Sequence, residues 1–108
     1  MDATFDVFVT SKKIVTVWPP FGLVSGGGIL IFNNYSDDRI LVEGISGLVE
    51  DKVEPIPAHS QGRYQVRDNA PKGGYSFKIK VKMNLHDREQ DVQLYAVTES
   101  DDPEIIIT

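Results

Sequence analysis

The sequence contains no cysteine in its 108 residues. The chain therefore has no disulfide framework, no thiolate zinc site, no cysteine nucleophile and no thiolate-ligated copper. Histidine is scarce as well: His59 and His86 are the only two, and neither has another metal ligand beside it at a binding spacing. We predict two isolated surface histidines, no bound metal and no other cofactor.

Long apolar runs and an excess of positive charge are also missing. No stretch reaches the roughly 18 apolar residues of a membrane-spanning helix, and residues 1–6 lack the basic and apolar regions of a signal peptide. Sixteen acidic residues outnumber eleven basic ones, which gives a net charge of −5. Nucleic-acid affinity comes largely from Lys and Arg neutralising phosphates, so this balance argues against nucleic acid as a partner. We expect a soluble, acidic protein with no membrane span, in a compartment that the sequence does not identify.

The clearest structural signal is an alternation of apolar and polar side chains over residues 74–84. Its odd positions carry apolar residues, and its even positions carry lysine, serine and asparagine, the period-2 pattern of a strand with one face in a core and one in water. We predict one continuous strand here, with Phe77 and Ile79 in the core. Its three lysines are interpreted as protection against pairing with other sheets, with docking of an anionic partner such as an acidic polysaccharide as the alternative.

Most of the remaining chain consists of short β-prone segments separated by turn residues, with no helical period. Residues 19–25 are predicted to be a loop, because Pro19 and Pro20 have no N–H to give to a sheet. Residues 48–58 are predicted to be a long connection or an irregular edge strand. The predicted strands are residues 4–10, 14–18, 29–33, 40–43, 60–67, 74–84, 92–98 and 104–108. About seven or eight strands at this spacing predict a single domain over residues 1–108, an all-β, antiparallel Greek-key β-sandwich.

Three short motifs follow one another in an order found in one family of β-sandwiches. Residues 32–34 are Phe-Asn-Asn, residues 57–60 are Pro-Ala-His-Ser, and residues 74–77 are Gly-Tyr-Ser-Phe. This order resembles the cupredoxin family, and the resemblance implies a cupredoxin-like scaffold, with an immunoglobulin-like sandwich as the alternative. Cupredoxins bind copper through two histidines, a cysteine thiolate and usually a methionine. Here Asp37 and Asp38 stand in the turn that carries the family's first histidine, and no cysteine follows Phe77, so the resemblance extends to the scaffold alone.

Other chemical signals in the sequence are weak. Asp37 and Asp38, and the acidic residues within 99–104, could offer carboxylates to calcium but lack the spacing of a calcium loop. Asn34-Tyr35-Ser36 is formally a glycosylation triplet, and we interpret it as a turn. No serine lies in a nucleophile-elbow context, so we predict that the chain is not an enzyme.

Three aromatic residues remain as a candidate binding surface: Trp18, Phe21 and Tyr35. They lie beside the Pro-Pro segment and the Asn-rich turn, and we predict a partner-binding patch at one end of the sandwich, where loops gather. The alternative is that Trp18 and Phe21 close the end of the core. The sequence thus favours a non-catalytic β-sandwich that acts as a binding or structural interaction module, with a protein partner or self-association. The competing hypotheses are a cupredoxin-like metal-binding or enzyme accessory protein with atypical ligands, and a carbohydrate-binding domain.

Overall fold

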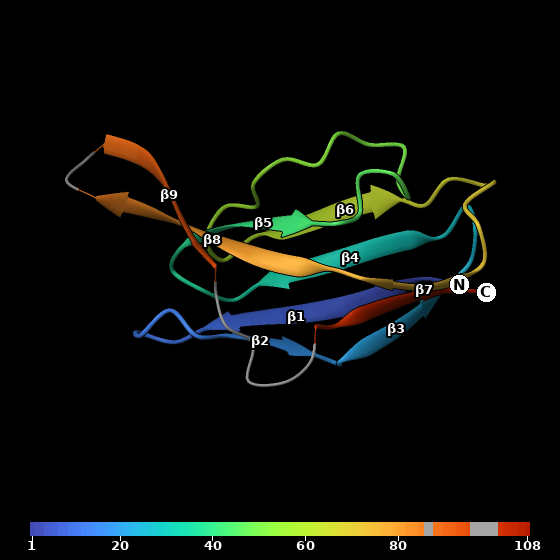
Figure 1. The fold of residues 1–108 in the computed structure, drawn as a ribbon, viewed down its shortest axis with the longest axis horizontal. Helices are drawn as coiled ribbons and strands as arrows, with labels where there is room; N and C mark the ends of the chain where they lie inside the picture. Colours follow the sequence, from blue (N-terminus) through green and yellow to red (C-terminus); the bar gives the residue numbers. More distant parts are fainter. Residues whose placement is uncertain (86–87, 96–101) are drawn as a thin grey trace.

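The computed structural model describes the backbone of residues 1–85, 88–95 and 102–108, and the side chains of residues 1–82 and 102–108. Within these ranges the protein is all-β and contains no helix (Figure 1). The strands are β1 (Ala3–Val9), β2 (Val15–Trp18), β3 (Phe21–Val24), β4 (Ile29–Asn34), β5 (Arg39–Glu43), β6 (Gln61–Gln65), β7 (Gly73–Ser76), β8 (Lys78–Leu85), β9 (Arg88–Tyr95) and β10 (Glu104–Ile107). Over these same ranges the chain forms no helix that could span a lipid bilayer.

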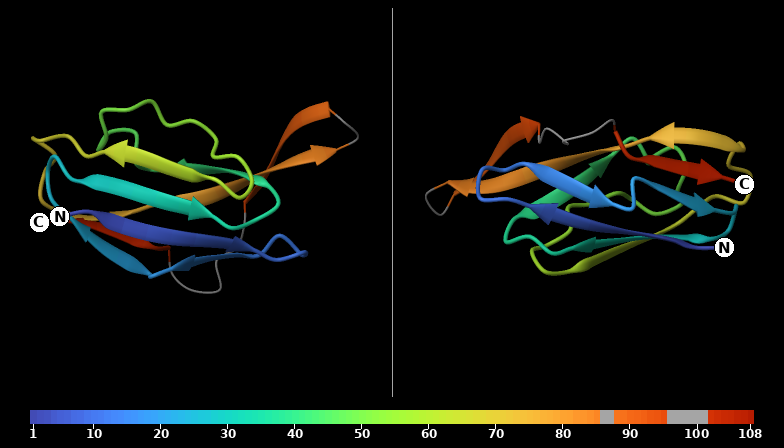
Figure 2. Two further views of the ribbon diagram at one scale, coloured as in Figure 1. Left: turned by 180° about the vertical axis from the view of Figure 1, so that it is seen from behind. Right: turned by 90° about the horizontal axis from the view of Figure 1, so that it is seen from below.

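The strands form three sheets, with the orders β2-β1-β4-β6, β3-β10-β7 and β5-β8-β9. In the right-hand view of Figure 2, β1 and β4 lie in one layer and β7, β8 and β10 lie in the other. The sheets are mixed, because β1 pairs with β4 in parallel and β10 pairs with β3 in parallel. The predicted all-β class is confirmed, but the predicted antiparallel pairing is wrong for these two pairs, and the described residues form ten strands where about seven or eight were expected. The chain leaves the first sheet after β2 and returns to it as β4, and a crossover of this kind can bring strands back in parallel.

The core is built around three phenylalanine rings. Phe5 and Phe32 lie on neighbouring strands of the four-stranded sheet and stack with their centroids 5.5 Å apart. Phe77 packs edge-on against both rings from the other layer, at 5.0 Å from Phe5 and 5.5 Å from Phe32. Edge-to-face pairs of this kind add to the hydrophobic gain of burying the rings, so this cluster joins the two layers.

The alternation over residues 74–84 is confirmed where side chains are described, but its continuity is not. Phe77, Ile79 and Val81 are buried, as the odd positions predict. The segment is divided at Phe77 into β7, which pairs with β10, and β8, which pairs with β5. The prediction of one strand fails because the chain changes hydrogen-bonding partner there, and side-chain periodicity carries no information about partners.

The prediction of a loop over residues 19–25 is wrong for residues 21–24, which form strand β3. Pro19 and Pro20 interrupt pairing, but the chain is already in the second sheet when β3 begins beside β10. Gly22 permits this approach: a Cβ atom placed there would lie 2.8 Å from the Phe5 ring. A glycine in an apolar strand is typical of such close contacts.

The remaining strand predictions are largely confirmed. The C-terminal strand is present as β10, with Ile105 and Ile107 buried and Ile106 half-buried. Residues 48–58 contain no named strand, although Val49 and Ile56 form isolated β-bridges. Strand β9 covers the first part of the predicted strand 92–98, and residues 96–98 lie outside the described residues.

Candidate functional site

The four-stranded sheet has one face on the core and one face in solvent, and we call the second the outer face. Along each strand the buried residues alternate with residues that point outward. The outer face consists of Thr4, Asp6 and Phe8 of β1, Thr16 and Trp18 of β2, Ile29, Ile31 and Asn33 of β4, and Gln61, Arg63 and Gln65 of β6.

One line of side chains crosses all four strands of this face. Trp18 lies opposite Asp6, Asp6 lies opposite Asn33, and Asn33 lies opposite Gln61. We call these residues the transverse row. Asn33 Nδ2 donates to Asp6 Oδ1 at 3.0 Å, and Gln61 Nε2 donates to Asn33 Oδ1 at 2.8 Å. Arg63, two residues further along β6, donates from Nη1 to Gln61 Oε1 at 3.3 Å. The planar polar groups are therefore fixed relative to one another at the protein surface.

Exposed aromatic side chains lie at the end of the row and beside it. Trp18 stands at the β2 end and is 64% exposed. Phe8 and Tyr35, each two residues beyond a member of the row, stack with their centroids 5.2 Å apart and their planes 13° apart. Tyr35 follows β4 directly, and its N–H donates to Val7 O at 2.9 Å. The outer face thus has a polar row with Trp18 at one end and an aromatic pair along one side.

The structure divides the predicted aromatic patch between the two layers. Trp18 and Tyr35 belong to the outer face and its margin, whereas Phe21 lies on β3 opposite Glu104. The interpretation that Trp18 and Phe21 close the core is wrong, since they are 64% and 57% exposed. Both residues sit on strands that point them away from the core, so the strand pattern and not the neighbouring prolines decides their exposure.

Sequence reasoning missed the polar members of the row. Asp6, Asn33 and Gln61 are far apart in the chain, and their alignment depends on strand register, which strand patterns do not specify. The one available signal was the outward parity of Asp6 between buried Phe5 and Val7. Without strand order, that parity could not be connected to the other strands.

The outer face is electrically balanced. Asp6 and Arg63 are its charged residues, and one negative and one positive charge sum to zero. The whole chain carries a net charge of −5, so its excess negative charge lies elsewhere.

On the core side of β6, Tyr64 packs edge-on against Phe32 and donates its hydroxyl to Glu54 O at 3.2 Å. Burial raises the pKa of Tyr64 above 10.0, and the negative charges of Asp51 and Glu54 raise it further. At neutral pH the hydroxyl is therefore protonated and holds the backbone of residue 54 against the inner side of the sheet. The outer side of the same strand carries Gln61 and Arg63.

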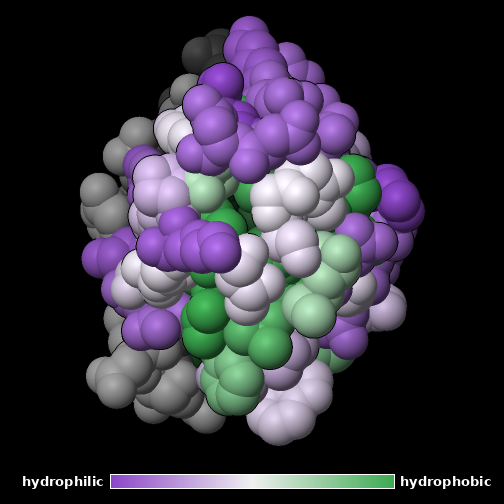
Figure 3. Space-filling view, turned by 90° about the vertical axis from the view of Figure 1, so that its right-hand side faces the viewer, coloured by the Kyte–Doolittle hydropathy of each residue, from purple (hydrophilic) through white to green (hydrophobic). Residues whose placement is uncertain are grey.

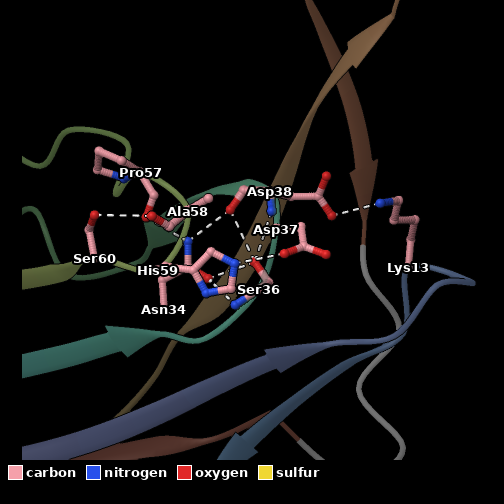
Figure 4. Close-up of polar contacts among 9 residues, drawn as sticks. All are labelled: Lys13, Asn34, Ser36, Asp37, Asp38, Pro57, Ala58, His59 and Ser60. Carbon is pink, nitrogen blue, oxygen red and sulfur yellow. Dashed lines mark hydrogen bonds and ion pairs between the residues drawn. The ribbon is translucent and has the colours of Figure 1, made fainter.

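The turn after β4 is fixed by the buried side chain of Asn34 (Figure 4). Its Nδ2 donates to the carbonyl oxygens of Asp38, Ile56 and Pro57, and its Oδ1 accepts from the N–H and the hydroxyl of Ser36. An amide held in this way is not presented for glycosylation, which supports the interpretation of residues 34–36 as a turn. The same contacts fix the position of Tyr35 beside the outer face.

Both carboxylates of this turn have protein partners. Asp38 pairs with Lys13 at 2.6 Å, and Asp37 Oδ1 lies 2.7 Å from His59 Nε2. In the part of the chain that the structure describes, no three His, Cys, Asp or Glu side chains are grouped as metal ligands. His86, the other histidine, lies outside the described residues, as do residues 99–101 of the acidic segment 99–104.

The lysines of β8 lie on the opposite layer from the outer face. Lys80 pairs with Glu43 of the adjacent strand, and Lys78 lies 4.0 Å from Asp102. These contacts fit lysines that are balanced by acidic residues across strands.

A further apolar surface lies at the end of the molecule that carries both termini. Figure 3 shows hydrophobic groups gathered in the middle of this end, with hydrophilic groups around them. Leu23 and Met1, which are 43% and 67% exposed, belong to the chain segments that end there.

No protein-family model matches the chain, and no curated protein sequence matches it either.

Proposed function

We propose that this chain is a non-catalytic binding module that acts without bound metal, and that its ligand lies on the outer face of the β2-β1-β4-β6 sheet. The transverse row is the observation that carries this proposal. Its hydrogen bonds join Asp6, Asn33 and Gln61 at distances of 2.8 to 3.0 Å, and Trp18 stands exposed at its end. Polar and aromatic groups fixed at a surface are suited to recognition because little ordering is required when the ligand arrives.

The supporting strands make this surface rigid. Residues on the inner side of the same strands, including Phe5, Phe32 and Tyr64, are packed in the core. Each outward side chain is therefore placed by a backbone that is paired to a neighbouring strand and anchored from below. A loop-built surface would lose more conformational entropy on binding.

The absence of a catalytic role is part of the proposal. The outer face, as defined by its described residues, combines threonine, amide, aromatic and aliphatic side chains with one carboxylate and one guanidinium. A nucleophile is ordinarily activated by an adjacent base that is itself oriented by a third group. Asp6 accepts a hydrogen bond from Asn33, an arrangement that supports binding more directly than proton transfer.

For the architecture we propose a Greek-key β-sandwich with a cupredoxin-like or immunoglobulin-like scaffold. The support is the passage of the chain between layers: β2 and β3 follow each other but belong to different sheets, and β7 and β8 do the same. Asn34, which belongs to the Phe-Asn-Asn motif on which the resemblance rests, is buried at the end of β4.

The proposal is tested by screening glycan and protein arrays with the wild-type chain and with an Asn33→Ala/Gln61→Ala variant. We expect at least one ligand to bind the wild type and to be lost from the variant. Lys78→Ser, which alters a 57% exposed side chain on the other layer, is the matched control and should retain binding. The proposal fails if every ligand binds the row variant as well as it binds the wild type.

Elemental analysis of the purified protein tests the metal-free part separately. The ordinary copper ligands of a cupredoxin are histidine and cysteine, and the chain has no cysteine. Titration with Cu(II) should give no intense thiolate absorption band. One tightly held copper per chain would overturn this part of the proposal.

A further inference from the structure

We propose that the ligand of the outer face is an extended, uncharged glycan, such as a β-1,4-linked hexopyranose chain, bound along the transverse row. This inference rests on the proposed function of the outer face and names the chemical class of its ligand. Four observations carry it: the hydrogen-bonding groups of the row, their neutrality, their position between two apolar groups and the straight line that they form.

The hydrogen-bonding groups of the row match adjacent hydroxyls. Asn33 and Gln61 each carry two amide N–H donors, and each uses one of them on its neighbour in the row. Asp6 Oδ1 accepts a hydrogen bond from Asn33 Nδ2, and the second oxygen of a carboxylate can accept another hydrogen bond. Planar groups of this kind present two polar atoms side by side. Neighbouring hydroxyls of a sugar ring, which both donate and accept, are complementary to such pairs.

The charge of the surface selects a neutral ligand. The negative charge of Asp6 and the positive charge of Arg63 cancel on the outer face. Hydrogen bonds through Asn33 and Gln61 connect these two charged groups. A phosphate or a uronic acid chain gains most from clustered positive charge, and this face has one arginine. A cationic ligand would gain correspondingly little from one carboxylate that is already hydrogen bonded.

The position of the polar groups favours a glycan over a protein. Protein interfaces usually have an apolar, aromatic centre and a polar rim. The outer face lacks this order, because the polar row lies between Ile31 on one side and the Phe8–Tyr35 pair on the other, with Trp18 at its end. A protein surface that covered the row would have to satisfy every buried amide and carboxylate, and each failure would cost about 1 to 3 kcal/mol.

The shape of the site favours an extended chain. From β2 to β6 the row crosses three strand spacings, which at about 4.8 Å each give a straight span of about 14 Å. A flat, extended glycan of a few sugar units can follow this span, whereas a coiled chain would leave it. The Trp18 indole, 64% exposed, offers an apolar ring to the C–H face of a terminal sugar and an N–H donor to a hydroxyl.

The test uses the intrinsic fluorescence of Trp18, which is the only tryptophan in the sequence. Cellohexaose, xylohexaose and β-1,4-mannohexaose are titrated into the wild type, into Asn33→Ala and Gln61→Ala, and into the control Lys78→Ser. We expect saturable fluorescence changes with at least one of these probes in the wild type and the control. Affinity should fall about tenfold in each row variant, the effect of losing about one good hydrogen bond. Circular dichroism melting identifies variants that remain folded, and calorimetric titration repeats the comparison without relying on Trp18.

Maltohexaose, which coils, and hexagalacturonate, which is anionic, serve as contrasting probes. Preferential binding of either one overturns the inference. If no glycan binds but a protein or peptide binds and depends on Asn33 and Gln61, the glycan inference is wrong and the proposed function stands. If no ligand of any class depends on the row, both are wrong.

Discussion

Replacing Asn34 with alanine should destabilise the protein strongly. The side chain is 2% exposed, and its Nδ2 donates to the carbonyl oxygens of Asp38, Ile56 and Pro57 at 2.8, 3.2 and 3.0 Å. Its Oδ1 accepts from the N–H and the hydroxyl of Ser36 at 3.0 and 2.6 Å. The variant therefore removes both amide donors and an acceptor: Pro57 O loses its donor, whereas Ile56 O keeps the N–H of Ile40 and Asp38 O keeps the hydroxyl of Ser36.

The magnitude follows from these contacts. Each hydrogen bond contributes about 1 kcal/mol net, and buried groups left unpaired add to the loss. We expect the free energy of unfolding to fall by about 2 to 4 kcal/mol, a large part of the roughly 5 to 15 kcal/mol that stabilises a typical domain. For a domain of this size the melting temperature should drop by about 10 °C or more. Urea titration and thermal melting followed by far-UV circular dichroism measure both quantities.

The neighbouring residue supplies the matched control. Asn33 is the same residue type on the same strand, but its side chain points to solvent and bonds to Asp6 and Gln61 there. Because water replaces those bonds, Asn33→Ala should cost about 0.5 to 1 kcal/mol. Equal losses at Asn33 and Asn34 would refute the assigned roles of the two faces.

Three further outcomes follow from the fold. The pKa of Tyr64 is raised above 10.0 by burial and, secondarily, by nearby acidic charges. The contribution of Tyr64 to the free energy of unfolding should therefore be fully present below pH 10 and be lost as the pH rises through the raised pKa. Tyr64→Phe should flatten this alkaline decline of the urea midpoint, and an unchanged slope would contradict the assignment. Ile79→Ala should lower the free energy of unfolding by about 2 to 5 kcal/mol. Lys78→Ser, on the solvent side of β8, should change it by no more than about 0.5 kcal/mol, and similar losses for the two variants would mean that the faces of β8 are wrongly assigned. Truncation after Asp102 removes β10, the central strand of its sheet, and should give an insoluble or strongly destabilised chain; a monomeric product that melts near the full-length temperature would contradict this.

Local patterns predicted the strands better than their arrangement. The buried residues of β8 and the strand character of β10 followed from alternation and from apolar β-branched residues, which are properties of single segments. The all-β class could be predicted for the same reason. The division at Phe77 could not, because both halves have the same side-chain period and differ only in the strand to which they bond.

The candidate site was predictable only in part. The sequence identified Trp18 and Tyr35 as aromatic residues worth testing, but it grouped them with Phe21, which the chain places on the other layer. Strand β3 is not predicted because Pro19 and Pro20 argue against a strand in this segment, although prolines interrupt pairing only where they stand. The transverse row required the parallel register of β1 with β4, a long-range pairing that no local signal specifies.

Amide chemical-shift mapping tests the central claim most directly. A ¹H–¹⁵N correlation spectrum is recorded as the β-1,4-linked hexasaccharide with the strongest fluorescence response is added, or, without such a response, the tightest ligand from the arrays. We predict that the largest changes fall on the outer-face residues of β1, β2, β4 and β6, including the side-chain amides of Asn33 and Gln61, and that the Asn33→Ala/Gln61→Ala variant loses them. Changes concentrated on β3, β10 and β7, and unaffected by that variant, would show that the ligand binds the other layer and would contradict the account.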